Sequence, residues 1–218
     1  MQAEYFDAER PAHEVEEFFR SLNFFNRLFS FSAPFQSSLP KLLDGSACKS
    51  LTILDVGGGD GSLGRILRQW AKQREWDWKV TNLDASWLAL RLNPAGTNVA
   101  ASGVALPFRD ASFDAVIASQ MAHHLDDVAA EQLLRETWRV TRKALLVSDL
   151  HRSLFLYLAI WAISGLQRYS SSFRGDALLS VRRAWRAKDL RCLAARAGLT
   201  SCNIQVQFSA RVILSARK

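Results

Sequence analysis

A glycine-rich segment with two carboxylates is the part of this 218-residue sequence whose residue types most directly suggest chemistry. It reads Asp55-Val-Gly-Gly-Gly-Asp-Gly61 and follows residues 51–56, a short apolar run typical of a buried parallel strand. Ligands of open α/β sheets bind beyond the carboxyl ends of such strands, and glycines there let the backbone approach a ligand closely. Residues 59–64 also form a literal Gly-x-Gly-x-x-Gly, so a dinucleotide site is one interpretation.

The charges of this loop favour a different ligand. A pyrophosphate binds bare backbone N–H groups at a helix N-terminus, and Asp55 and Asp60 would repel it. A ligand with an ammonium group and no phosphate would be attracted instead, and S-adenosylmethionine (SAM) is such a ligand. The turn begins directly after the strand, so its glycines are counted from Gly57, as Gly57, Gly59 and Gly61. A Gly-x-Gly-x-x-Gly motif counted from Gly57 would need glycine at position 62, which is serine. We therefore interpret the loop as a SAM site.

A further carboxylate, Asp84, ends the next apolar run, residues 78–83. At the end of the second strand of such a fold, an acidic side chain can bind both ribose hydroxyls. The same side chain could instead cap a helix expected at residues 87–92. Because the glycine loop precedes it, we favour ribose binding.

Histidines follow two later strands, and each could act as a general base. His123 and His124 come after the strand expected at residues 113–119, and His151 comes after the strand expected at 144–150, close to Asp149. Imidazole titrates near neutral pH and suits proton abstraction. We prefer His124 as the base. The alternatives are that the histidines only pack or bind backbone groups, and that Asp149 orients a histidine or binds substrate.

The elements that position these groups follow from the alternation of apolar runs and amphipathic segments. Strand–helix–strand units at this spacing imply right-handed crossovers and a parallel sheet, hence a doubly wound α/β fold. A closing antiparallel pair is expected at residues 203–208 and 210–214. The other expected strands are 51–56, 78–83, 113–119 and 144–150, and the expected helices are 62–72, 87–92, 128–140 and 188–197.

Two apolar segments outside this pattern predict a pocket for a second ligand. Eight of the 13 phenylalanines lie within the first 35 residues, and their spacing predicts an N-terminal helix over part of residues 13–35. Residues 154–166 are apolar nearly all round and precede a loop expected at 169–176. Both segments could be ordinary core, but we expect them to roof a hydrophobic, aromatic or alkylated acceptor. Arginines that could pair with a carboxylate on it are Arg182, Arg183 and Arg186.

The order of these motifs resembles that of class I SAM-dependent methyltransferases. The resemblance is carried by residues 54–61, by Asn82-Leu-Asp84, by residues 106–114 and by His123-His-Leu125, and it extends over about residues 12–200. It is closest to the small-molecule group of ubiquinone and menaquinone C-methyltransferases (methyltransferase type 11). Some segments look like a bacterial subgroup associated with polyketide or aromatic secondary metabolism.

This resemblance implies a fold, a set of boundaries and residue roles. It implies a Rossmann-like, mostly parallel seven-stranded sheet in one domain, with an N-terminal helical cap (12–48), a SAM-binding core (50–150), a helical lid inserted after the fifth strand (151–187) and a C-terminal helix and strand pair (188–218). Ser102 stands where an adenine-binding aspartate is usual, so that contact is expected to be weaker. Gln120 and Met121 would lie beside the transferred methyl group. The residues that would line the cofactor are Asp55, Gly57, Gly58, Gly59, Gly61, Asp84, Ala85, Ser102, Gly103, Gln120 and Met121.

Charge and composition leave other functions open. Residues 139–218 hold 15 basic and 3 acidic residues. An RNA or protein methyltransferase that docks through this region is therefore the alternative function. A third possible function is that of a SAM-binding protein that contacts a partner or an anionic membrane surface. Three cysteines without Cys-x-x-Cys spacing indicate neither disulfides nor a zinc site, and we expect no metal. No secretory signal is visible, so a cytoplasmic location is expected.

Overall fold

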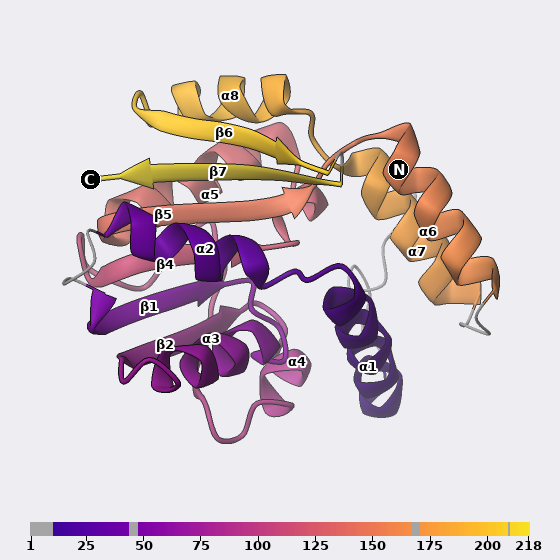
Figure 1. Ribbon diagram of the computed structural model, residues 1–218, viewed down its shortest axis with the longest axis horizontal. Helices are drawn as coiled ribbons and strands as arrows, with labels where there is room; N and C mark the ends of the chain where they lie inside the picture. The colour runs from indigo at the N-terminus through magenta and orange to yellow at the C-terminus, as the bar shows by residue number, and fades with distance from the viewer. Residues whose placement is uncertain (1–10, 44–47, 167–170, 209) are drawn as a thin grey trace.

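The computed structural model describes residues 11–43, 48–166, 171–208 and 210–218, in which helices flank a seven-stranded sheet (Figure 1). The strand order is β3-β2-β1-β4-β5-β7-β6. Strands β1 to β5 pair in parallel, and β7 runs antiparallel to both of its neighbours, β5 and β6. The strands are β1 (Ser50–Val56), β2 (Asp77–Asp84), β3 (Thr97–Ala100), β4 (Phe113–Ser119), β5 (Thr141–Leu150), β6 (Cys202–Gln207) and β7 (Arg211–Arg217).

The helices divide between the two faces of the sheet because alternate strand side chains point to opposite faces. On one face, Leu54 and Val56 of β1 pack in a core with residues of α5 and α8. On the other face, Leu51 and Ile53 pack in a core with residues of α2 and α3. The helices are α1 (Ala12–Leu28), α2 (Ala33–Leu42), α3 (Ser62–Lys72), α4 (Trp87–Arg91), the short η3 (Ala122–His124), α5 (Asp127–Val140), α6 (Leu154–Leu166), α7 (Ser171–Arg183) and α8 (Ala187–Arg196).

The predicted Rossmann-like α/β fold is confirmed, and most predicted elements lie within a few residues of their expected bounds. The helix expected at 62–72 and the strand expected at 113–119 match α3 and β4. The antiparallel closing pair is present as β6 and β7. Strand β3 was not predicted from the sequence. It has four residues, one of them asparagine, and none of them is fully buried, so it lacks the apolar run that marks a strand.

The helix predicted within residues 13–35 is present as α1, whereas the loop expected at 169–176 was wrong where it is described. A second, separate helix follows α1, because Ser30 adopts a left-handed conformation (φ 49°) and Pro34 starts α2. The part of the expected loop that is described, 171–176, is helical in α7, and residues 169–170 of that loop lie outside the described residues. Helix α7 forms because Val181 and its apolar neighbours pack on Leu156 and Ile160 of α6.

The carboxyl ends of the parallel strands meet at one edge of the sheet, and α1, α6 and α7 lie beyond that edge, on the right of Figure 1. The groups predicted to do chemistry follow β1, β2, β4 and β5, so the topology brings most of them to this edge. Among the described residues, no helix is long and apolar enough to cross a membrane.

Candidate functional site

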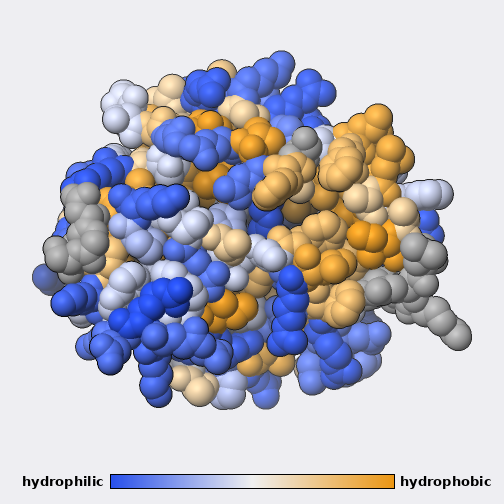
Figure 2. Space-filling view, viewed as in Figure 1, coloured by the Kyte–Doolittle hydropathy of each residue, from blue (hydrophilic) through white to orange (hydrophobic). Residues whose placement is uncertain are grey.

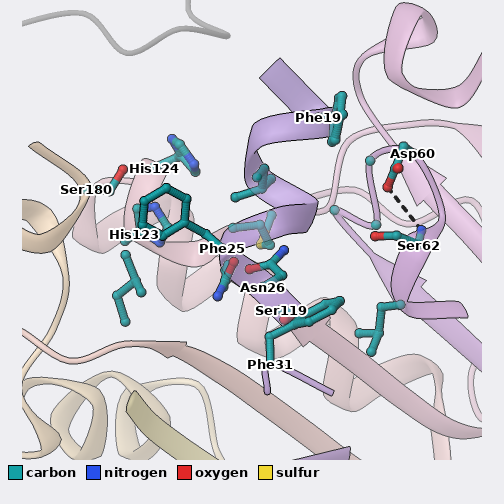
Figure 3. A pocket seen from close by; sticks show the side chains of 18 of the residues that line it. Phe19, Phe25, Asn26, Phe31, Asp60, Ser62, Ser119, His123, His124 and Ser180 are labelled. Atoms are coloured by element: carbon teal, nitrogen blue, oxygen red, sulfur yellow. Dashed lines mark hydrogen bonds between the residues drawn. The ribbon is translucent and has the colours of Figure 1, made fainter. Parts of the chain in front are cut away.

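A cavity of about 1150 Å³ opens at this edge of the sheet (Figure 3). One end is formed by the glycine loop, the end of β2 and residues 101–104. The other end is formed by α1, α6, α7 and the connection between β6 and β7. Residues 119–125 line it between these parts, so one continuous cavity has a polar end on the sheet and an apolar end under the helices.

The glycine loop is held in place by side chains that leave no room for a Cβ atom. At Gly58, a Cβ would lie within 3 Å of both the Asp55 carboxylate and the Asn82 amide oxygen. Gly59 has φ +53°, and a Cβ there would lie 2.6 Å from the Phe19 ring of α1. The loop therefore needs glycine both for its left-handed backbone and for the close approach of α1.

Asp55 is the feature of the loop that calls for a cationic ligand. Its side chain is completely buried, and neither carboxylate oxygen has a hydrogen-bond partner among the described residues. Burial, together with the negative charges of Asp84 and Asp60, raises the pKa of Asp55 to about 8. An ammonium group beside this carboxylate would satisfy both its charge and its lone pairs, so the site fits the amino-acid end of SAM.

Asp60, the second acidic residue of the loop, has a structural role. It accepts hydrogen bonds from Asn23 of α1 (2.8 Å) and from the Ser62 backbone (3.0 Å), and it forms an ion pair with Arg65 (3.2 Å). Figure 3 marks the bond to Ser62. These contacts fasten the loop to α1 and α3, and they leave Asp55 as the carboxylate of the loop without a partner.

Asp84, expected from the sequence to hold a ribose, is anchored at the end of β2. Its two oxygens accept hydrogen bonds from the backbone N–H groups of Gly59 and Ser86, each at 2.8 Å. Burial raises its pKa, and these two N–H groups oppose that rise. The alternative role as a helix cap is wrong, because the Ser86 hydroxyl caps α4 by accepting from Ala89. Asp84 lines the cavity.

The other predicted cofactor residues also line the cavity. Met121 packs its side chain against Gly57, and Gln120 has a left-handed backbone (φ 53°), a strained conformation that recurs at functional sites. Ser102 is exposed and accepts a hydrogen bond from the Val104 backbone. Of the predicted cofactor residues, those that line the cavity are Asp55, Gly57, Gly58, Gly59, Asp84, Ala85, Ser102, Gly103, Gln120 and Met121; Gly61, at the start of α3, does not.

The three histidines occupy different environments. The Nδ1 of His123 lies 2.6 Å from Asp149, both side chains are buried, and the His123 backbone N–H donates to the other Asp149 oxygen. Burial alone would raise the pKa of Asp149, but His123 and the Leu150 N–H outweigh it and lower that pKa. His124 is exposed, with its ring 4.3 Å from that of His123. His151 does not line the cavity, so the structure does not bring it to the site.

The arginines at the helical end differ from those expected. Arg182 donates to the Tyr157 hydroxyl, and none of the three arginines proposed to meet the acceptor lines the cavity. Arg211, at the start of β7, does line it and is buried. Asn26 of α1 is a second buried polar residue in the wall (Figure 3). Sequence patterns gave no signal for either, because their positions depend on how α1 and β7 pack.

Comparison with known proteins agrees with this site. Residues 54–146 match the family model described as a methyltransferase domain. Together with the fold and the glycine loop, this match makes residues 54–146 similar to the methyltransferase domains of class I SAM-dependent methyltransferases.

Individual relatives are distant. An uncharacterized methyltransferase of Mycolicibacterium gilvum is 24% identical over 185 residues, which are 76% of this chain. The chain spans 64% of the length of that curated relative.

Solved structures share the fold at low sequence identity. A SAM-dependent methyltransferase from Thermotoga maritima is 18% identical with a TM-score of 0.63, over 95% of this chain and 100% of that one. The plantazolicin methyltransferase, solved with S-adenosylhomocysteine and a substrate analogue, is 11% identical with a TM-score of 0.68, over 95% of both chains. Magnesium protoporphyrin IX methyltransferase from Synechocystis PCC 6803, solved with S-adenosylhomocysteine, is 18% identical with a TM-score of 0.57, over 86% of this chain and 83% of that one.

Proposed function

We propose that this protein transfers the methyl group of SAM to an oxygen or carbon atom of a hydrophobic small molecule that is aromatic, phenolic, quinone-like or polyketide-like. The observation that carries this proposal is the continuous cavity, which joins the unpartnered Asp55 carboxylate at one end to an apolar chamber at the other. Two ligands of different chemistry can therefore meet within it. Plantazolicin and magnesium protoporphyrin IX, named for two structural neighbours, are consistent with such an acceptor.

The apolar chamber supports a planar, hydrophobic acceptor. Aromatic rings of α1 form one wall, and apolar side chains of α6 form another. The rim carries large exposed side chains, including Leu28, Phe155 and Phe208, and Figure 2 shows hydrophobic residues gathered over α6. Apolar rings in such numbers around a cavity mouth favour an apolar ligand over an RNA strand, whose phosphates need cationic walls.

When bound, SAM supplies an electrophilic methyl group on a sulfonium, which a nucleophile receives by in-line displacement. The protein's own part is to place the two ligands and to move a proton. Asp55 would hold the ammonium group, Asp84 the ribose hydroxyls, and the helices would exclude water from the chamber.

His123 is the base that the geometry supports best. The ionised Asp149 can only accept a hydrogen bond, so the Nδ1 atom of His123 carries the proton and Nε2 is the basic atom. A carboxylate that fixes the tautomer in this way also raises the basicity of the imidazole. His124, preferred from the sequence, is exposed and lines the cavity, and we propose it instead as a part of the cavity wall.

Calorimetric titration with S-adenosylhomocysteine, with NADH as the control, tests the cofactor half of this proposal. A screen of phenols, quinones and polyketide-like acceptors with SAM, read by mass spectrometry, tests the other half. We expect S-adenosylhomocysteine alone to bind and at least one acceptor class to gain a methyl group. Methylation of transfer RNA in the same assay, with no small molecule modified, would contradict the proposed substrate class and support the alternative function.

A further inference from the structure

Arg211 is a buried cation in the wall of a largely apolar chamber, whose lining also includes Asp176 of α7. Only 7% of its surface is exposed. Its guanidinium donates to the backbone carbonyls of Phe29 (3.2 Å) and Phe31 (3.4 Å), which accounts for two of its five N–H donors. Within the described part of the chain, no carboxylate lies within 4.0 Å of it. Burial lowers the pKa of Arg211 to about 10, partly offset by the negative charge of Asp149, so the group stays charged at neutral pH.

A buried charge without a counter-ion is unfavourable, and proteins normally pair it. Neutral carbonyl acceptors compensate a guanidinium only in part, because a hydrogen bond between two charged groups is about twice as strong. Asp149 is committed to His123 at 2.6 Å. Asp149 therefore acts on Arg211 through its charge only, and the guanidinium keeps donors that a carboxylate of a ligand could use.

Other buried polar side chains line the same cavity. Asn26, from α1, is 6% exposed and lines the same cavity, as does the buried Ser180 of α7. Figure 3 shows Asn26 and Ser180 on the cavity side of their helices, with Phe25 and Phe31 close by. In the sheet, Arg211 pairs with Leu150, the residue that follows Asp149. Successive strand side chains point to opposite faces, so the link between Arg211 and the His123–Asp149 pair is the electrostatic interaction of Arg211 with Asp149.

We propose that Arg211 binds an anionic oxygen group of the acceptor, a carboxylate or the oxyanion of an acidic phenol or enol. The inference rests on the proposed function and adds to it that the acceptor is a hydrophobic acid rather than a neutral molecule. The planar fork of a guanidinium suits such a group because it can donate two parallel hydrogen bonds. Binding at Arg211 would fix which atom of the acceptor faces the methyl donor.

A pair of matched probes tests this assignment. Binding of 1-naphthoate and of 1-naphthalenemethanol to the protein saturated with S-adenosylhomocysteine is measured by calorimetry. The two probes share a ring system and differ in charge. We expect the carboxylate to bind the wild-type protein at least about tenfold more tightly than the alcohol. Arg211→Met should remove this preference and leave the affinity for the alcohol within about twofold.

Two further variants separate ligand binding from structural support. Arg211→Lys keeps the charge but loses the fork, so it should retain part of the preference, and it replaces Arg211→Met if the latter does not fold. Arg182→Met removes an exposed arginine outside the cavity and should behave as wild type. A structural role would weaken both probes equally, so only a change in the ratio of the two affinities supports the proposal.

The proposal is overturned if the wild-type protein binds the two probes equally, if it binds no naphthoate, or if Arg211→Met keeps the preference. Its failure is distinguishable from failure of the proposed function. A protein that binds S-adenosylhomocysteine and methylates neutral acceptors lacks the anion site but remains a methyltransferase. A protein that binds naphthoate through Arg211 and methylates nothing has the anion site without the activity.

Discussion

Asp55→Asn should stabilise the ligand-free protein at high pH while it abolishes cofactor binding. The buried Asp55 carboxyl has its pKa raised from 3.8 to about 8, so it is protonated in the folded protein at neutral pH and ionised in the unfolded chain. A raised pKa contributes stability that is fully present below pH 3.8 and is lost as the pH rises through 8. Asparagine is uncharged at every pH and has nearly the same shape, so the free energy of unfolding of the variant does not fall in this way.

The size of this stability difference follows from the shift in the pKa of Asp55. About four pKa units at about 1.4 kcal/mol each correspond to about 6 kcal/mol in the free energy of unfolding between pH 4 and pH 9. This loss is comparable to the whole stability of many domains. The variant should therefore match the wild-type protein near pH 4 and exceed it by several kcal/mol at pH 9.

Urea denaturation of both proteins without ligand, at intervals from pH 4 to pH 9, measures the difference directly. Asp77→Asn is the matched control, because Asp77 is an exposed carboxylate paired only with Lys79 on the surface, and its stability difference should stay flat with pH. Calorimetry with S-adenosylhomocysteine should detect binding to the wild-type protein and to Asp77→Asn but not to Asp55→Asn. A stability difference for Asp55→Asn that does not grow with pH would refute the reasoning.

Three further predictions concern other parts of the site. His123→Asn should reduce turnover by about 10²-fold or more and leave the affinity for S-adenosylhomocysteine unchanged, whereas His124→Asn should reduce turnover less; equal losses would argue against His123 as the base. Phe155→Asp should raise the KM for the acceptor, whereas Leu154→Asp, which changes an exposed residue outside the cavity, should not. An acceptor assay that shows the same KM for both variants would mean that α6 does not cover the acceptor. Gly59→Ala should lower both the melting temperature and the cofactor affinity, because it has φ +53° and its Cβ would meet a phenylalanine of α1, and a thermal-shift assay that finds neither change would disprove this packing argument.

The sheet edge of the site could be predicted because strand ends are visible in the sequence. Asp55 and Asp84 each end an apolar run, and parallel strands place their carboxyl ends at one edge whatever the tertiary details. The histidines after β4 were found for the same reason. His151 follows a strand end too, but it bridges to Trp185 and does not reach the cavity.

The apolar segments of the helical end were expected from the sequence and line the cavity, but its polar residues could not be predicted, because nothing local encodes their positions. Arg211 starts an antiparallel strand, and it reaches the cavity only because β7 lies beside β5 in the sheet. Asn26 lines the cavity because Asn23 and Phe19 fix α1 on the glycine loop, a contact between segments about 35 residues apart. Helix α7 was mistaken for a loop because its serines and glycine favour turns, whereas its packing on α6 decides its structure.

The two buried ionisable groups, Asp55 and Arg211, make ligand binding at the two ends of the cavity respond differently to pH. The cofactor's ammonium group needs an ionised Asp55, so below pH 8 its binding must also release the Asp55 proton. The affinity for S-adenosylhomocysteine should therefore fall up to about tenfold for each pH unit from 8 to 6, and calorimetry in buffers of different ionisation enthalpy should detect the released proton. Arg211 stays charged over this whole range, so naphthoate affinity should stay constant. Cofactor affinity that is flat from pH 6 to 8 would mean that Asp55 is already ionised in the free protein, and the stability prediction for Asp55→Asn would fail with it.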